Sequence, residues 1–328
     1  MTVRGFFRAV KVESAKPPYD TIHLKVLYPA QISGSQQQLA QGILPADSDL
    51  APFPIVIFFG GINCEPSMYQ WLAVQLAQRG MVVVTFAWVG ENLPGMVSLS
   101  PGVDMAMTKP ATYGTGSTAL ALPALLAELE SLQAKGILAG MLNLQQIILG
   151  GHSAGGRMAL ENANPRFYPP VAAAFSYGAH SAAATMLGFP PNTILPLPSD
   201  VPMLLMGGTR DGVIAANRWI YGMSGADPTE SIRRTFEEAI AGGRDDKYLL
   251  LLEGANHFSI AYPSDTTVGS SLQDLPATQP EDAIRSLLGD AVGLFIDAHV
   301  RHKRGASQAL DELLSSHNPL VAFYVERK

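Results

Sequence analysis

The sequence is poor in several features that would assign a protein class directly. It has one cysteine, Cys64, which excludes an internal disulfide framework and a multi-cysteine metal cage. Only 15% of the residues are charged, the net charge is −6 and no basic run occurs, so we expect no nucleic-acid partner. No apolar run approaches the roughly 18 residues that a membrane-spanning helix needs.

Two further absences concern targeting and cofactors. The first residues contain neither a continuous apolar segment nor a small-residue cleavage site, so no secretory signal is predicted and a cytoplasmic location is expected. The sequence also lacks paired histidines or cysteines at metal-ligand spacing and a phosphate-binding glycine loop. We therefore expect no metal and no cofactor.

Apolar residues are plentiful and follow a regular pattern. They make up 47% of the chain, which is enough for a large core and excludes intrinsic disorder. Continuous apolar stretches alternate with helical patterns, which predicts a doubly wound, mostly parallel sheet covered on both faces. The expected strands are residues 54–59, 81–88, 145–149, 171–177, 202–206 and 248–252, and the expected helices are 67–78, 119–135, 154–163 and 282–302.

One motif carries chemistry. Residues 151–155 read Gly-His-Ser-Ala-Gly, between the expected strand at 145–149 and a helical pattern. In this context the pattern G-x-S-x-G predicts a sharp turn that projects the Ser153 hydroxyl above the sheet. The backbone N–H of Ala154 then lies at a helix start, where it can bind a developing oxyanion. The alternative is a glycine-rich turn with a passive serine.

A nucleophilic serine needs a base, and the base needs an orienting acid. Asp211 and His257 each follow an expected strand, at the edge where open α/β sheets place their sites. Asp104 and Asp200 are weaker candidates for the acid because neither directly follows a strong strand. His180 also follows a strand, but it precedes Asp211 in the chain.

These residues together resemble those of the α/β-hydrolases, in which serine, acid and histidine occur in this order. The resemblance runs from about residue 23 to residue 302 and implies an α/β-hydrolase fold. It further implies a single domain over residues 1–328. The composition of the stretches between the expected strands predicts cap-like excursions from the sheet at about 91–117, 181–200 and 212–247. Residues 21–30 (TIHLKVLYPA) resemble the opening strand of the chlorophyllase, platelet-activating-factor acetylhydrolase and dienelactone-hydrolase-like esterases.

The chain departs from that branch at two positions. Gly60 stands where these enzymes usually have a histidine in the oxyanion turn, and Ala154 stands where plant chlorophyllases tend to have arginine. By its position after the first long strand, Ile62 is expected to supply the second oxyanion donor, with Gly61 as the nearest rival. The resulting prediction is a serine carboxylic-ester hydrolase with Ser153 as nucleophile.

The expected substrate is a large hydrophobic ester. Met- and Pro-rich excursions follow strands whose carboxyl ends face Ser153, and methionine adapts to irregular apolar partners. The resemblance makes the phytyl ester of chlorophyll the best guess, with a lipid ester or a small ester or lactone as alternatives. Low charge and a mean hydropathy of +0.15 are also consistent with a weak, peripheral association with membranes. The residues expected to contact substrate are Gly61, Cys64, Met105, Met107, His180 and Phe189.

Several alternatives stay open at this point. The excursions could instead pack on one another as a lid or form a dimer contact. An amidase, a peptidase or an acyltransferase would use the same three residues, and a non-catalytic binding protein could keep the same fold. No pattern in the sequence predicts the oligomeric state.

Overall fold

The computed structural model describes residues 1–32, 35–93, 95–315 and 318–327. Within them a ten-stranded sheet has the strand order β1-β2-β4-β3-β6-β7-β8-β9-β10, and β5 pairs with β4 outside this path. The strands are β1 (Thr2–Lys11), β2 (Thr21–Ala30), β3 (Phe53–Phe59), β4 (Val82–Leu93), β5 (Met96–Leu99), β6 (Leu142–His152), β7 (Val171–Tyr177), β8 (Met203–Gly208), β9 (Lys247–Leu252) and β10 (Val321–Arg327).

The six central strands, from β4 to β9 in the sheet, run parallel. The edge strands are antiparallel: β1 and β2 on one side, β10 on the other. The helices are α1 (Gln36–Gln41), α2 (Gln70–Gln78), α3 (Ala121–Ala134), α4 (Ala154–Glu161), α5 (Gly212–Asn217), α6 (Glu230–Arg234), α7 (Glu281–His299) and α8 (Ala306–Leu313).

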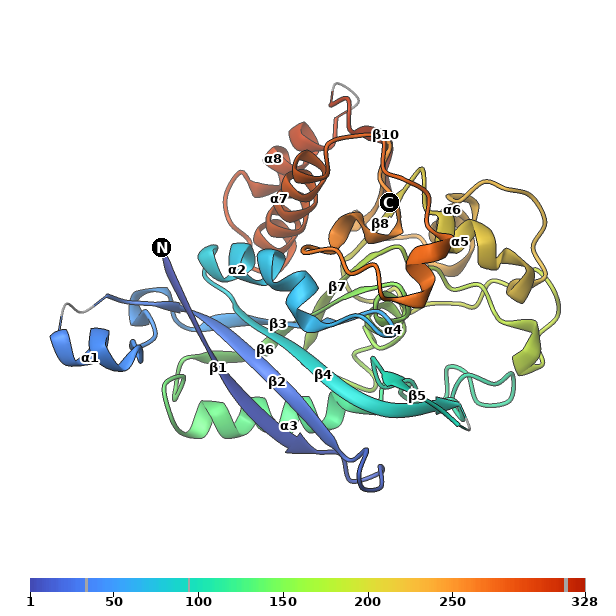
Figure 1. Cartoon of the computed structure of the whole chain (residues 1–328). Helices are drawn as coiled ribbons and strands as arrows, with labels where there is room; N and C mark the ends of the chain where they lie inside the picture. The colour runs from blue at the N-terminus through green and yellow to red at the C-terminus, as the bar shows by residue number, and fades with distance from the viewer. Residues whose placement is uncertain (33–34, 94, 316–317, 328) are drawn as a thin grey trace.

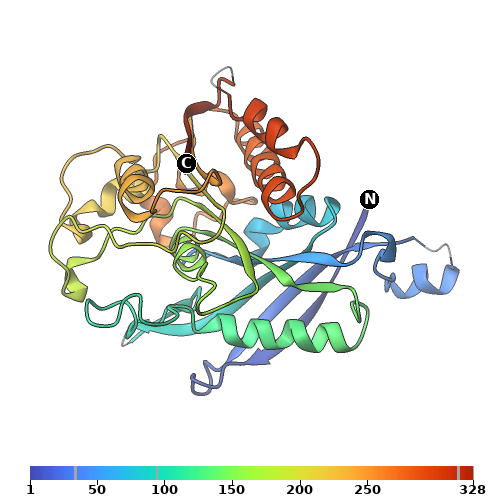
Figure 2. The same ribbon diagram turned by 180° about the vertical axis from the view of Figure 1, so that it is seen from behind.

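Helices cover both faces of the sheet. Side chains alternate between faces along a strand, so Ile55 and Ile57 of β3 belong to a core with α3 and α4, whereas Val56 and Phe58 belong to a second core with α2, α7 and α8. Figures 1 and 2 show α3 on one side of the sheet and the α2, α7 and α8 group on the other. Because the central strands are buried on both faces, their sequences are continuously apolar.

The expected parallel sheet is confirmed, and each of the six apolar stretches forms one of its central strands. The expectation missed β1, β5 and β10, which lie at the edge of the sheet or outside its main path. In β1 most side chains are partly or fully exposed, so it lacks the apolar continuity that marks the buried strands. Among the described helices, none is long and apolar enough to cross a bilayer.

Candidate active site

Ser153 lies on a strained turn between β6 and α4. Its backbone angles are φ 54° and ψ −125°, a conformation that non-glycine residues rarely adopt. The flanking glycines are required by close contact: a β-carbon on Gly151 would lie 2.4 Å from the Gly155 carbonyl oxygen, and one on Gly155 would lie 2.3 Å from the carbonyl oxygens of Phe59 and Gly60. The elbow predicted from the sequence is therefore formed, with α4 packed tightly against the end of β3.

Asp211 and His257 form a buried hydrogen-bonded pair. Asp211 follows β8 and caps α5, accepting from the Ile214 N–H over 2.8 Å with one carboxylate oxygen. Its other oxygen lies 2.7 Å from His257 Nδ1. Gly178 makes room for the pair, because a β-carbon there would lie 3.1 Å from His257 Nδ1 and 3.4 Å from the Asp211 carboxylate. A histidine held in this way carries a proton on Nδ1 and leaves Nε2 free to act as a base.

The electrostatics of the pair favour the charged imidazolium. Burial alone would lower the pKa of His257, but the charge of the Asp211 carboxylate and its hydrogen bond outweigh burial and raise this pKa above 6.5. A histidine whose pKa is raised in this way accepts a proton more readily than an isolated imidazole.

Asp274 is part of this site and was not expected from the sequence. Its carboxylate accepts hydrogen bonds from the backbone N–H groups of Gly212, His257 and Phe258, over 3.0, 3.2 and 3.1 Å. Burial, and then the charge of Asp211, raise the pKa of Asp274. Asp274 therefore connects two segments: the loop that contains His257 and the start of α5, which Asp211 caps.

Two backbone N–H groups beside Ser153 are available as donors. Ala154 is the first residue of α4, where helical N–H groups have no intrahelical acceptor. The N–H of Gly61 donates to the Tyr69 hydroxyl over 3.2 Å, whereas the N–H of Ile62 has no hydrogen-bond partner among the described residues. Of the two expected rivals for the second donor, Gly61 is thus engaged and Ile62 is free.

Tyr69 and His152 connect this turn to the backbone of His257. The His257 carbonyl can only accept, so His152 Nε2, 3.0 Å away, carries the proton. His152 Nδ1 must then accept the Tyr69 hydroxyl proton over 2.8 Å. A chain of hydrogen bonds with fixed direction therefore runs from Gly61 through Tyr69 and His152 to the backbone of His257. Burial, followed by the charge of His257, lowers the pKa of His152 well below 6.5 and keeps the ring neutral.

Ser153 and His257 line two cavities. The first has a volume of about 360 Å³ and mostly apolar walls; the second, of about 350 Å³, is more polar. His257 has one side-chain hydrogen bond among the described residues, to Asp211, and Ser153 Oγ has none. Catalytic hydrogen bonds commonly tighten only when substrate is bound.

The residues expected to contact substrate divide into three groups. Met105 and His180 line the first cavity. Gly61 and Cys64 line the second. Met107 and Phe189 line neither, and a β-carbon on Gly116 would meet the Met107 methyl group at 3.0 Å. Arg157 and Tyr221 also line the first cavity, and no sequence pattern pointed to them.

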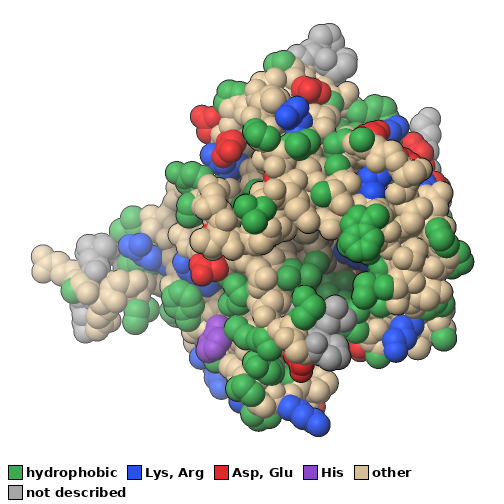
Figure 3. All heavy atoms as spheres, turned by 45° about the vertical axis from the view of Figure 1, so that its right-hand side comes forward, with side chains coloured by type: hydrophobic (Ala, Val, Ile, Leu, Met, Phe, Trp, Pro, Cys, Tyr) green, Lys and Arg blue, Asp and Glu red, His purple; other side chains and the backbone are tan. Residues whose placement is uncertain are grey.

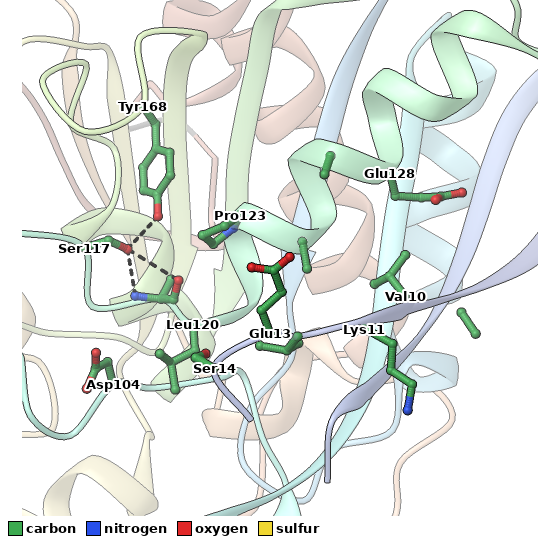
Figure 4. Close-up of a pocket in the computed structure, with 15 residues that line it drawn as sticks. Val10, Lys11, Glu13, Ser14, Asp104, Ser117, Leu120, Pro123, Glu128 and Tyr168 are labelled. Carbon is green, nitrogen blue, oxygen red and sulfur yellow. Dashed lines mark hydrogen bonds between the residues drawn. The ribbon is translucent and has the colours of Figure 1, made fainter. Parts of the chain in front are cut away.

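A larger cavity, of about 790 Å³, lies elsewhere, between the end of β1 and α3 (Figure 4). Asp104 lines it, and Tyr168 donates to Ser117 Oγ over 2.8 Å within it. Its described lining residues include no histidine, so Ser117 has no base there. Asp104 is therefore separate from the His257 site. The negative charge of Asp200 interacts electrostatically with Arg244 and Lys247 instead. No three His, Cys, Asp or Glu side chains are grouped as metal ligands in the described ranges.

Comparison with known proteins supports the fold. No family model matches the chain, and no curated protein matches it. Among solved structures, a ferulic acid esterase from Streptomyces cinnamoneus is similar, with a TM-score of 0.57 and 17% sequence identity over 92% of this chain and 91% of that one. The expected α/β-hydrolase fold is confirmed by this likeness and by the sheet order.

Proposed function

We propose that the protein is a serine carboxylic-ester hydrolase. Ser153 attacks the ester carbonyl, His257 takes the serine proton, and Asp211 orients the imidazole and stabilises its charged form. The observation that carries the proposal is the buried Asp211–His257 hydrogen bond of 2.7 Å beside a serine with φ 54°. The free N–H groups of Ile62 and Ala154 would hold the negative charge that develops on the carbonyl oxygen.

The reaction then proceeds in two steps. The bond from Ser153 Oγ to the acyl carbon forms and the bond to the alcohol breaks, while His257 passes its proton to the leaving alcohol. Water, activated by His257, attacks the acyl-enzyme; His257 returns the proton to Ser153 and the acid is released. These two reaction steps require no metal or cofactor.

Fold likeness to a ferulic acid esterase supports an ester substrate over an amide. The same three residues would serve an amidase, so paired ester and anilide substrates with a common acyl group separate the two activities. Faster turnover of the anilide would contradict the proposal.

The proposed substrate has one apolar half. Two cavities flank Ser153, so the acyl and alcohol parts of an ester can occupy separate spaces, of which the first is apolar. The preference for a large apolar group is tested by measuring kcat/KM for esters of increasing size. The largest of them are a feruloyl ester and the phytyl ester of chlorophyll. A chlorophyllase-like activity requires that the phytyl ester be cleaved faster than a short ester.

An apolar rim supports weak, peripheral binding to membranes. Figure 3 shows hydrophobic side chains gathered around a hollow on one face of the molecule. Three exposed side chains are direct sequence neighbours of cavity-lining residues: Met186 next to Leu187, Trp219 next to Ile220, and Leu272 next to Gln273. Co-sedimentation with lipid vesicles should therefore capture more of the wild type than of a variant with Trp219→Ser and Leu272→Ser.

The nucleophile is tested by labelling and turnover together. A fluorophosphonate should modify the wild type on Ser153, and Ser153→Ala should lose both labelling and about 10⁶-fold in kcat, as happens when a triad serine is removed. Ser286→Ala, on the exposed side of α7, is the matched control. Labelling that persists in Ser153→Ala would place the nucleophile elsewhere.

A further inference from the structure

Besides Ser153, three side chains that line the first cavity each leave a hydrogen-bond donor unpaired among the described residues. Arg157, His180 and Tyr221 come from three separate segments and all line the same space as Ser153. The apolar part of the wall includes Val103, Met105, Met158, Leu187, Ile214 and Ile220. Polar groups in such a place cost free energy unless something accepts their hydrogen bonds.

Arg157 lies one helical turn after Ser153 in α4 and uses only part of its guanidinium within the protein. Its Nε is 2.7 Å from Glu161, and its Nη1 donates to the Ala182 carbonyl over 2.9 Å. Nη2 has no partner among the described residues. The Glu161 carboxylate is 2% exposed and also accepts from Thr118, so it compensates the arginine charge in place.

His180 presents a single donor. Its Nδ1 accepts from the Ala182 N–H over 3.2 Å, which fixes the proton of the neutral ring on Nε2. Burial, and then the charges of Arg157, His257 and Arg218, lower the pKa of His180 to about 3, so the ring is neutral at physiological pH. His180 is 9% exposed, and its Nε2 has no partner in the described part of the chain.

Tyr221 completes the group. Its ring meets His180 edge-on, with 4.7 Å between ring centroids and 89° between planes. Arg157 is near enough to act on the phenol electrostatically, but burial has the larger effect and raises the pKa of Tyr221. The hydroxyl therefore keeps its proton, and among the described residues it has no hydrogen-bond partner.

We propose that this cavity binds the half of an ester whose apolar stem ends in an uncharged oxygen acceptor, such as a ketone or amide carbonyl. The inference rests on the proposed esterase function and names its substrate class. The stem packs against the apolar wall, and the terminal oxygen accepts from Arg157 Nη2, His180 Nε2 and the Tyr221 hydroxyl. A substrate of this kind satisfies donors that a hydrocarbon would leave unpaired.

The end group is uncharged because the charges at this end of the cavity are already balanced. Glu161 neutralises Arg157, and His180 carries no charge. A carboxylate entering here would lose its hydration and gain no unpaired cation in return, which is unfavourable in a buried site.

The test uses three isosteric series of para-nitrophenyl esters. One series carries keto acids from levulinate upward in length, the second replaces the keto oxygen by a methyl group, and the third replaces the terminal methyl by an ionised oxygen. The same end groups are also built into the alcohol half, and all rates are corrected for spontaneous cleavage. Whether the keto group is in the acyl part or in the alcohol part decides which ester places it in the cavity. In one of these two positions, kcat/KM for the keto ester should exceed that for both isosteres by at least about tenfold. The reason is that a site built to hydrogen-bond discriminates against analogues that leave its donors unpaired.

Two variants assign the preference to these residues. Tyr221→Phe keeps the ring contact with His180 and should reduce the ratio of keto to hydrocarbon rates severalfold. Arg157→Gln combined with Glu161→Gln removes both charges together and should reduce the same ratio. Tyr28→Phe, which deletes a phenol hydroxyl that donates to the Leu44 carbonyl and lines neither cavity beside Ser153, is the matched control and should keep the wild-type ratio.

Each outcome has a defined meaning. Equal rates for keto and hydrocarbon esters in both halves overturn the inference, as does a preference for the carboxylate series. If short esters are cleaved and Ser153 is labelled while no end-group preference exists, the inference fails and the esterase function stands. If no ester is cleaved, binding of the keto esters to Ser153→Ala, measured by calorimetry, still decides whether the donors recognise an oxygen.

Discussion

The Tyr69 hydroxyl donates to His152 Nδ1 over 2.8 Å while it accepts from the Gly61 N–H. The Tyr69 side chain thus links the turn before Ile62 to the elbow that carries Ser153. Gly60 brings no side chain to this turn, and Tyr69 supports the turn from a different place in the chain.

Replacing Tyr69 should impair turnover more than binding. In Tyr69→Phe the Gly61 N–H and His152 Nδ1 lose their partner in a buried place, at a cost of about 1–3 kcal/mol in the free energy of unfolding. The Ile62 donor would also shift, so kcat should fall by about 10-fold to 100-fold with little change in KM, below the loss for deleting an oxyanion donor outright. Steady-state kinetics and thermal unfolding measure both effects, with Tyr168→Phe as control. A drop in Tm with unchanged kcat would make Tyr69 purely structural.

Asp211 should set the pH dependence. Because the Asp211 carboxylate raises the pKa of His257, the acid limb of kcat/KM should lie above pH 6.5, where the base becomes neutral. Asp211→Asn keeps an oxygen to cap α5 but removes the charge, so kcat should fall by about 10⁴ and the limb should move to lower pH. Asp200→Asn is the control, and a limb that stays in place would contradict the assignment of the acid.

The same pKa has a consequence for stability. His257 has a higher pKa in the folded state than in the unfolded state, so it contributes stability below pH 6.5 and loses this contribution as the pH rises through its folded-state value. Chemical denaturation of Ser153→Ala with and without Asp211→Asn should show that this dependence disappears with the carboxylate.

Met105 should determine how activity rises with substrate size. It lines the apolar cavity and Met107 does not, so Met105→Ser should flatten the increase of kcat/KM with chain length while Met107→Ser leaves it intact. Burial of about 25 cal/mol per Å² makes an additional ~100 Å² of substrate contact worth up to ~2.5 kcal/mol. If kcat/KM is highest for acetate in the wild type, the substrate is a small ester or lactone.

Cys64 should have no chemical role. Burial raises the pKa of its thiol, and its Sγ lies 3.6 Å from the Ile62 carbonyl oxygen. Thiol-alkylating reagents should leave activity intact, and Cys64→Ser should change kcat by less than about tenfold, within what a packing change of ~1.4 kcal/mol explains. A larger loss would show that the thiol shapes the second cavity directly.

The sequence predicted the parts of the site whose signals are local. The elbow needs glycines at fixed spacing around Ser153, and the order of strands predicts where Asp211 and His257 come together. The contributions of Tyr69 and Asp274 were not predictable in this way, because each is defined by partners far away in the chain: Tyr69 by His152, 83 residues on. The same holds for the cavity donors, since no pattern within α4 indicates that Arg157 leaves one nitrogen unpaired.

The positive φ of Ser153 places activity and folding stability in opposition at one position. The backbone conformation that exposes the hydroxyl is one that glycine adopts freely, so the chain gives up about 1–3 kcal/mol to hold a serine there. Selection for thermal tolerance alone would therefore favour replacing Ser153, the proposed nucleophile, with glycine. Attempts to stabilise the protein by directed evolution therefore need selection for turnover in the same round.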